Sequence, residues 1–412
     1  MPKSLRQIAS EMDPLINSQS EVQLSNVLRQ HRWLAGISAS DRSFREVVRR
    51  HSNSALIRFL SYNTYLTEAH ITLPDPVPDL RITAKPALHA RAAEIGQMIF
   101  SDYDFASLYE VMQEKQRNEI LAAWEQTPPD NFFGGTLSSL FTISRKFKIG
   151  RRKKLTFRNK GKVFKVTLVP IVGPTVNLSL DSDFYAEKGV ILTEILTMFG
   201  TVEVFSTHLM FGGGFGRIGE DALNAAVPFG AHISESNPSE RLATQLKQID
   251  ELIAFYNEQH RPENVGILCG DFNIDGSNVG NFNQLKNRLA SIRMRDVWAT
   301  GPFINNLAGG QTARNDDDDT KPHEADFANV CTESVAGGDH CDDRVGPGHP
   351  PPPDCVGRFD YIFVEDPQPL HKCNLDLSRV RRRQFRRRQS TGGQSFLSDH
   401  LGLETTLFVS KK

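Results

Sequence analysis

Two polar side chains follow an apolar run in the stretch ILCGDFNIDG, residues 267–276. In extended backbone, Asp271 and Asn273 leave the strand on one face while Phe272 points to the other. Carboxylate and amide oxygens are the ligands that Mg²⁺ takes in proteins. The pair therefore indicates a metal or phosphate site at a strand tip. The alternative is an ordinary turn, because Asp and Asn are also common turn residues.

Other apolar runs end in side chains of the same chemical kind. The set is Asn63, Glu110, His208, Asp360, Asp399 and His400. Each of them alone also fits a cap, a turn or a histidine bonded to the backbone. Together they match phosphodiester cleavage, which needs a polarised phosphoryl group, an activated water and help for the departing alkoxide. Histidine is the usual side chain that takes up a proton near neutral pH.

For these residues to lie together, the strands that carry them must end at the same edge of packed sheets, with helices covering the outer faces. Helical periodicity covers residues 86–101 and 238–260, where Leu242, Leu246 and Ile249 share one stripe. Residues 188–200 and 201–210 predict a hairpin joined at Gly200. Residues 150–162, GRRKKLTFRNKGK, are predicted as a basic turn between two strands. The expected strands are residues 55–66, 105–111, 138–149, 162–172, 188–200, 201–210, 265–273, 358–364 and 400–409. Irregular alternation of strands and helices favours sheets packed face to face over a doubly wound parallel sheet.

Length and composition allow a sizeable core. The chain has 412 residues, 39% of them hydrophobic and 24% charged. We expect a helical N-terminal extension over residues 1–56 and a catalytic domain over 57–412, with a long acidic and proline-rich loop insertion at 301–357. Loops of that length are usually functional or disordered. Cys269 is expected to be a buried thiol. Free thiols are favoured for Cys331, Cys341, Cys355 and Cys373; the alternatives are two disulfides or a zinc site, although no C-x-x-C pair supports zinc.

The charge and hydropathy of the chain bear on its binding partners and its cellular location. A net charge of -1 gives no global attraction to nucleic acid or anionic membrane. The basic runs at Arg151–Lys154 and Arg379–Arg388 would bind nucleic-acid phosphates or anionic lipid, unless they are solvated loops. No apolar run reaches the roughly 20 residues of a membrane span, so no transmembrane segment is expected. The start lacks the apolar core of a classical signal peptide, which predicts a cytoplasmic protein or non-classical export. We expect a monomer.

In this order the motifs resemble the endonuclease/exonuclease/phosphatase superfamily of metal-dependent phosphohydrolases. The resemblance spans about residues 57–409, and GDFN with the terminal SDH is its most specific pair of signatures. It implies a DNase I-like, four-layered α/β sandwich: two packed mixed β-sheets flanked by helices. It also implies a divalent metal, Mg²⁺ with Mn²⁺ or Co²⁺ as alternatives. The implied metal-site residues are Glu110, Asn63 and Asp399, and the implied catalytic residues are His400, His208, Asp271, Asn273 and Asp360.

The roles that the resemblance implies are distinct. His400 is the general base, and Asp360 orients it. His208 and Asn273 contact the phosphate, and Asp271 lies at the water and leaving-group side.

The segment LDSDFYAEKGVILTEI is similar to the sphingomyelinase branch, in which an Asp, four residues and then Lys-Gly lead into a strand. Asp183, Lys188 and Gly189 fit that pattern, and Lys188 would bind a non-bridging phosphate oxygen. The resemblance thus predicts a phosphodiesterase that releases a phospho-headgroup from sphingomyelin or a related phospholipid at a membrane surface. A Mg²⁺-dependent nuclease on the same scaffold is the second hypothesis, and a catalytically silent interaction module is the third.

Overall fold

The structure is a computed structural model that describes part of the chain. The described residues are 54–66, 68–71, 80–83, 88–122, 132–134, 140–160, 164–168, 176–178, 188–210, 232–235, 238–276, 278–297, 358–377, 380–383, 385, 397 and 402–412. Residues 1–53 of the predicted N-terminal extension, the 301–357 insertion and half of the second arginine run lie outside them, whereas residues 55 and 56 belong to a strand and not to a helical extension. Cys331, Cys341 and Cys355 also lie outside the described residues, whereas Cys269 and Cys373 are buried free thiols.

Two mixed sheets form the centre of the described chain. The first has the strand order β16-β18-β1-β4-β6-β5, with β17 beside β18, and the second has the order β14-β15-β13-β11-β10-β7. The first sheet's strands are β1 (Ala55–Leu66), β4 (Phe105–Val111), β5 (Phe132–Gly134), β6 (Leu140–Ser144), β16 (Cys373–Leu377), β17 (Arg381–Arg383) and β18 (Gly402–Lys411). The second sheet's are β7 (Lys148–Thr156), β10 (Gly189–Leu196), β11 (Thr201–His208), β13 (Val265–Asp271), β14 (Met294–Asp296) and β15 (Asp360–Glu365).

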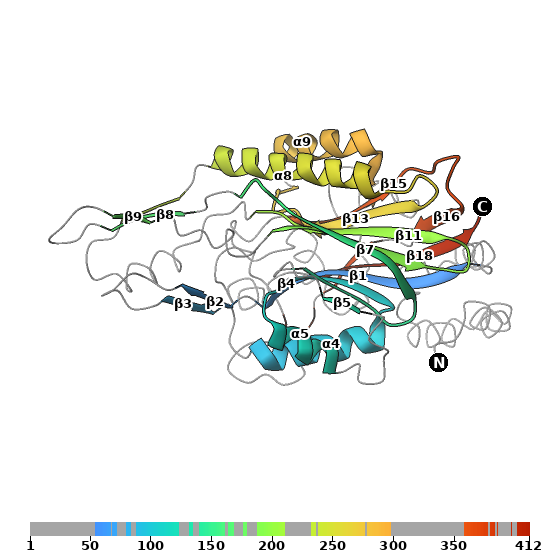
Figure 1. Ribbon diagram of the computed structural model, residues 1–412, viewed down its shortest axis with the longest axis horizontal. Helices are drawn as coiled ribbons and strands as arrows, with labels where there is room; N and C mark the ends of the chain where they lie inside the picture. The colour runs from blue at the N-terminus through green and yellow to red at the C-terminus, as the bar shows by residue number, and fades with distance from the viewer. Residues whose placement is uncertain are drawn as a thin grey trace, which may run out of the picture.

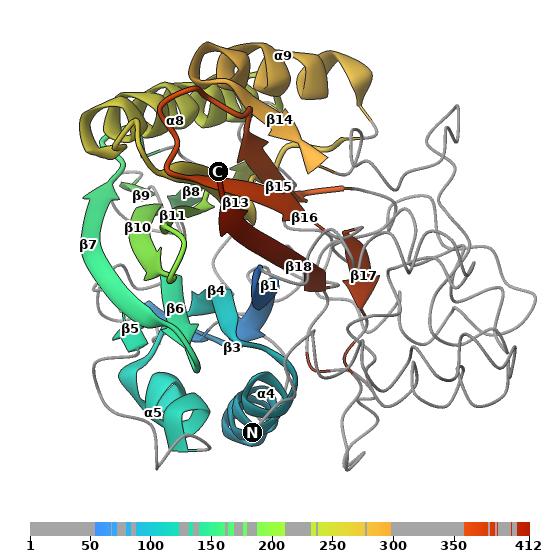
Figure 2. The ribbon, with the colours of Figure 1, turned by 90° about the vertical axis from the view of Figure 1, so that its right-hand side faces the viewer.

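Helices cover the outer face of each sheet. The helices are α4 (Leu88–Asp102), α5 (Glu114–Ala122), α8 (Pro238–Gln259), α9 (Val279–Leu289) and the short 3-10 helix η3 (Ala290–Ile292). Smaller sheets are formed by β2 (Glu68–Ile71) with β3 (Leu80–Thr83), and by β8 (Phe164–Leu168) with β9 (Val176–Leu178) and β12 (His232–Glu235). Figures 1 and 2 show α8 and α9 over the second sheet and α4 and α5 under the first. This order of layers confirms the predicted four-layered α/β sandwich.

Strand alternation divides the core among these layers. Ile57 and Phe59 of β1 meet Ile267 of β13 between the two sheets, whereas Leu60 packs outward against α4. Leu246 and Ile249 of α8 cover the outer face of the second sheet, as their helical stripe predicts. Residues two apart on a strand share a face, so the same alternation continues to the polar strand ends.

The local structure agrees with one sequence-based expectation and contradicts another. The hairpin at Gly200 is confirmed: β10 and β11 pair antiparallel, and the amide of Thr197 donates to the carbonyl of Gly200. The basic turn at 150–162 is wrong, because Lys148–Thr156 forms the edge strand β7 beside β10. Arg151 in that strand pairs with buried Glu194 and Glu203, so its charges are satisfied within the sheet rather than in a turn. None of the described helices is long and apolar enough to span a bilayer.

Candidate functional site

Three strands of the second sheet bring polar residues into one row. His208 of β11 lies beside Asp271 of β13, and Asp271 lies opposite Asp360 of β15. Directly paired residues project from the same face of a sheet, and here that face is the space between the two sheets. Gly270 permits the close approach of β11 and β13, since a Cβ atom there would collide with the carbonyl group of Thr207.

The first sheet supplies Asn63 and Glu110 from the other side of the same space. Asn63 continues the inward series of Ile57, Phe59 and Ser61 on β1 and is fully buried. Glu110 follows Tyr109, which already points inward, so simple alternation would turn Glu110 toward the helices. Instead Glu110 has a φ of 59°, in the left-handed region that non-glycine residues rarely adopt. The backbone twist redirects the carboxylate into the site.

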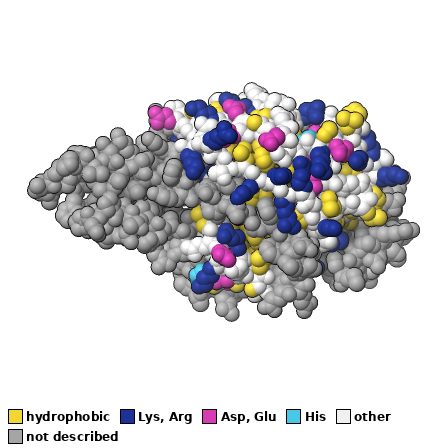
Figure 3. All heavy atoms as spheres, in the orientation of Figure 1, with side chains coloured by type: hydrophobic (Ala, Val, Ile, Leu, Met, Phe, Trp, Pro, Cys, Tyr) yellow, Lys and Arg dark blue, Asp and Glu magenta, His cyan; other side chains and the backbone are white. Residues whose placement is uncertain are grey.

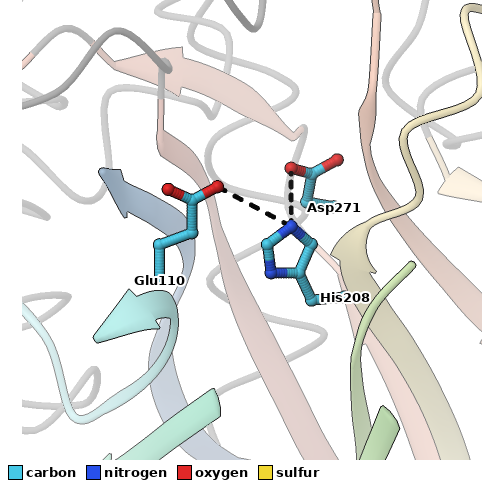
Figure 4. Close-up of side chains that lie close together, drawn as sticks. All are labelled: Glu110, His208 and Asp271. Carbon is cyan, nitrogen blue, oxygen red and sulfur yellow. Dashed lines mark ion pairs between the residues drawn. The ribbon is translucent and has the colours of Figure 1, made fainter. Parts of the chain in front are cut away.

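The side chains from the two sheets meet within hydrogen-bonding distance. The amide nitrogen of Asn63 donates to Glu110 Oε1 and to Asp271 Oδ2, at 3.0 Å each. His208 Nε2 lies 3.7 Å from Glu110 Oε1 and 3.5 Å from Asp271 Oδ2. Figure 4 shows both carboxylates directed at the same imidazole nitrogen. His208 and Asp271 are about 1% exposed, whereas the Glu110 side chain is 16% exposed and forms the accessible side of the cluster.

Lys188 adds a positive charge to this cluster. Its Nζ lies 2.6 Å from His208 Nε2 and 3.2 Å from His208 Nδ1, and the residue is only 6% exposed. Lys188 precedes β10, and its carbonyl accepts the amide of Phe157 just beyond β7. One buried ammonium group thus stands beside two carboxylates and one imidazole, and as a compact cation it is the group of this cluster that could bind an anionic oxygen.

Asn273 does not occupy the extended position that the sequence predicts. β13 ends at Asp271, and Asn273 has a φ of 52°. This turn lets the Asn273 amide N–H donate to Asp271 Oδ1 at 2.9 Å, while its side chain donates to the carbonyl of Leu209 at 3.1 Å. Phe272 does point the other way, into the core against Tyr361 and Phe363. Asn273 therefore holds the Asp271 carboxylate in place.

The cluster fits a divalent cation. Glu110, His208 and Asp271 each offer one ligand atom, and these three atoms lie within 4.8 Å of one another. No other group of three or more His, Cys, Asp or Glu residues in the described part of the chain meets this criterion. Carboxylate oxygens suit Mg²⁺, whereas an imidazole nitrogen also favours transition metals. Asn63 can present its oxygen instead of its nitrogen when the amide is turned over.

Beneath the cluster lies a layer of neutral polar groups. The hydroxyl of Tyr109 lies 2.8 Å from Ser61 Oγ and donates to Cys269 Sγ at 3.4 Å. Burial raises the pKa of Tyr109 well above its usual value, and burial also raises the pKa of the Cys269 thiol. Both groups stay protonated, so the floor of the site carries no charge that competes with the carboxylates above it.

The described residues include seven of the ten predicted site residues. Asn63, Glu110, Lys188, His208, Asp271 and Asn273 lie together, and Asp360 is buried beside Asp271 in the sheet. Asp183, Asp399 and His400 lie outside the described residues, so their roles stay predictions. The sequence-based prediction missed Gln245 of α8, which contacts the Asn273 backbone. Its signal was a polar residue directly before Leu246 in the apolar stripe of the helix.

Comparisons with known proteins gave matches only among solved structures. No family model and no curated protein matches the chain. The crystal structure of beta toxin 275-280 from Staphylococcus aureus is similar, with a TM-score of 0.48 and 15% identity, over 85% of this chain and 99% of that one. Sphingomyelinase C from Streptomyces griseocarneus is similar with a TM-score of 0.48 and 16% identity, and the match covers 85% of this chain and 99% of that one. Truncated TDP2 from Caenorhabditis elegans is similar with a TM-score of 0.45 and 13% identity, and the match covers 86% of this chain and 98% of that one.

Proposed function

We propose that this chain is a metal-dependent phosphodiesterase of the endonuclease/exonuclease/phosphatase kind. The supporting observation is the cluster of Glu110, His208 and Asp271, gathered from two different sheets and joined by Asn63. Buried acidic and basic side chains are costly unless function or pairing retains them. Here the cluster lies at the ends of strands from both sheets, and the Glu110 side chain is 16% exposed.

Each described residue has a role in this proposal. Glu110 and Asp271 would hold Mg²⁺, which when bound polarises a phosphoryl oxygen. Lys188 and His208 would stabilise the negative charge that grows on the phosphoryl oxygens as water attacks. Asn273 would contact the phosphate. The predicted general base His400, oriented by Asp360, would take the proton of the attacking water, and Asp399 and Asp183 would complete the metal and substrate sites.

The proposed substrate is sphingomyelin or a related phospholipid at a membrane surface, cleaved to ceramide or diglyceride and a phospho-headgroup. Residues 145–160 contain nine Lys and Arg residues and no acid, and Figure 3 shows such side chains along the face over β7. Lys153 and Lys154 in β7 are exposed. Each lysine near an anionic bilayer contributes about 1 kcal/mol to binding. The strand ends beside Lys188, so this basic edge would hold a membrane close to the site.

The test is release of phosphocholine from sphingomyelin vesicles, with Mg²⁺ or with EDTA, beside plasmid nicking by the same preparation. We expect Mg²⁺-dependent phosphocholine release that rises when phosphatidylserine is added and falls at high salt. Glu110→Gln serves as the matched inactive variant, since it keeps the shape and loses the charge. Absence of both activities in the wild type would reject the phosphodiesterase.

A nuclease on the same scaffold is the second candidate. The observation that favours it is the same basic edge, because lysines that attract anionic lipid also neutralise nucleic-acid phosphates. Plasmid nicking without phosphocholine release would decide for the nuclease. Lys188 and His208, which contact each other, would then bind a nucleic-acid phosphate instead of the phosphate of a lipid headgroup.

A further inference from the structure

A buried side chain of helix α8, Gln245, contacts both loops that leave the candidate site. The residue is 2% exposed. Its Nε2 donates to the carbonyl oxygen of Asn273 at 2.7 Å and to the carbonyl oxygen of Met210 at 2.9 Å. Met210 lies two residues after His208, and Asn273 lies two residues after Asp271. A single amide group thus joins the two loops that leave the site.

The loops are also bonded to each other. The amide of Leu209 donates to the carbonyl of Asp271 at 3.0 Å, and the Asn273 side chain returns a bond to the carbonyl of Leu209. Gln248, one turn further along α8, accepts the amide of Met210 at 2.8 Å. Every backbone group in this sequence of contacts is buried, so each needs a partner. Gln245 is the group that links both loops to the helix.

Asn273 is the residue whose geometry depends most on this link. Its left-handed backbone is costly for a residue with a side chain. In that conformation its N–H reaches Asp271 Oδ1, which leaves Asp271 Oδ2 for Asn63 and His208. A bond that fixes the Asn273 carbonyl therefore fixes the direction of the Asp271 carboxylate.

Glutamine suits this position for a chemical reason. Two carbonyl oxygens converge on one point, and a neutral amide NH₂ offers two donors there. An ionised glutamate offers no donor, and an apolar side chain would leave both carbonyls unpaired in the core.

We propose that Gln245 is a positioning residue of the active site, which sets the Asp271 carboxylate through the backbone of Asn273. This inference rests on the proposed function. Gln245 itself touches neither the metal position nor the substrate. Partners behind a metal ligand commonly change metal affinity or turnover by roughly 10- to 100-fold when they are removed.

The variant Gln245→Met keeps the length of the side chain and removes both donors. We expect kcat to fall roughly 10- to 100-fold with KM little changed, and the affinity for Mg²⁺ alone, by titration calorimetry, to fall in the same range. Hydrogen exchange of the Asn273 amide should become about tenfold faster or more, because its conformation is no longer fixed.

The matched control is Thr193→Val, which removes a buried hydrogen bond between Thr193 and Thr142 of 3.0 Å, four strand positions from the site. It should lower Tm to a comparable extent and leave kcat, Mg²⁺ affinity and Asn273 exchange unchanged. If Gln245→Met does not fold, Gln245→Asn is measured instead, since it keeps the amide but shortens its reach.

Two failures are distinguishable. If Gln245→Met lowers Tm as much as Thr193→Val does, yet keeps the wild-type kcat, Mg²⁺ affinity and exchange rate of the Asn273 amide, Gln245 is not a positioning residue. If the wild type cleaves neither sphingomyelin nor DNA, the proposed function fails. The exchange rate of the Asn273 amide, which needs no substrate, then still decides whether Gln245 sets this loop.

Discussion

At the scale of single residues, the candidate site is built at positions where the backbone departs from its regular form. Both Glu110 and Asn273 have positive φ angles, of 59° and 52°. Such angles cost residues with a Cβ atom roughly 1–2 kcal/mol. At Glu110 the departure turns an outward position of β4 inward, so the strain places a carboxylate where alternation would not.

This strain predicts an unusual effect of glycine at position 110. In EDTA, Glu110→Gly should unfold in urea with a free energy about 0.5–1 kcal/mol higher than Glu110→Ala, because glycine adopts this conformation without a steric penalty. Both variants should be inactive. At Glu119, inside helix α5, the order should reverse, with glycine about 1 kcal/mol less stable than alanine. Equal stabilities of the two variants at position 110 would show that Glu110 is not strained.

At the scale of elements, the sequence predicted the buried faces of strands and helices well, and it predicted positions with irregular backbone or without an apolar pattern poorly. Alternation and helical periodicity identified β1, β13, α8 and the hairpin at Gly200, since burial repeats along each element. β7 was missed because it is an edge strand of mostly basic residues without an apolar alternation, and its Arg151 bonds to Glu194 of β10 and Glu203 of β11.

The residues of the candidate site differ in the same way, in whether a local sequence pattern predicts their direction. Asn63, His208 and Asp271 follow from alternation along their strands. Glu110 follows only from its motif, because its facing depends on the left-handed φ angle. Gln245 depends on a contact across 28 residues that no local pattern contains.

The end of α8 opposite the candidate site carries a buried ionic network. His260 Nδ1 lies 2.8 Å from Glu203 Oε2, and His260 Nε2 lies 3.4 Å from Glu365 Oε2. His371 Nε2 also lies 3.4 Å from Glu365 Oε2, and Arg151 and Arg293 reach the outer oxygens of the two glutamates. Burial opposes a charge on His260, but hydrogen bonds to Glu203 and Glu365 outweigh it and raise its pKa to about 9.

This shift predicts that the contribution of His260 to stability depends on pH. The folded state binds the proton more tightly than the unfolded state, whose histidine pKa is about 6.5. The stabilisation, on the order of 3 kcal/mol at most, is therefore complete below pH of about 6.5 and disappears as pH rises through about 9. The free energy of unfolding should differ between wild type and His260→Asn at pH 6, and much less at pH 10. His89→Asn, at a half-exposed pair with Glu119, should change stability little at either pH. A His260→Asn difference that stays constant from pH 6 to pH 10 would refute the shift.

At the scale of the whole molecule, one ion pair stands where the 301–357 segment leaves and re-enters the described fold. Arg358 donates to both carboxylate oxygens of Asp296, at 2.8 Å each, and lies over the ring of Tyr361. The backbone of Arg358 also bonds to Asp275 and Gly276, in the loop that follows Asn273. The described residues on either side of positions 298–357 are thus joined to each other, directly beside the loop of the candidate site.

This arrangement predicts that the segment can be shortened without loss of the fold. Replacing residues 301–357 by about ten Gly and Ser residues should raise the free energy of unfolding by about 1–2 kcal/mol, because closing a shorter loop costs less entropy. Mg²⁺ affinity and turnover of a small soluble phosphodiester should stay at wild-type values. Adding Asp296→Asn to the shortened chain should remove the gain, since it breaks a largely buried charge pair and leaves Arg358 without its carboxylate. A shortened chain that unfolds while Asp296 and Arg358 are intact would mean that the segment contributes to the core, and that the ion pair alone does not hold its ends.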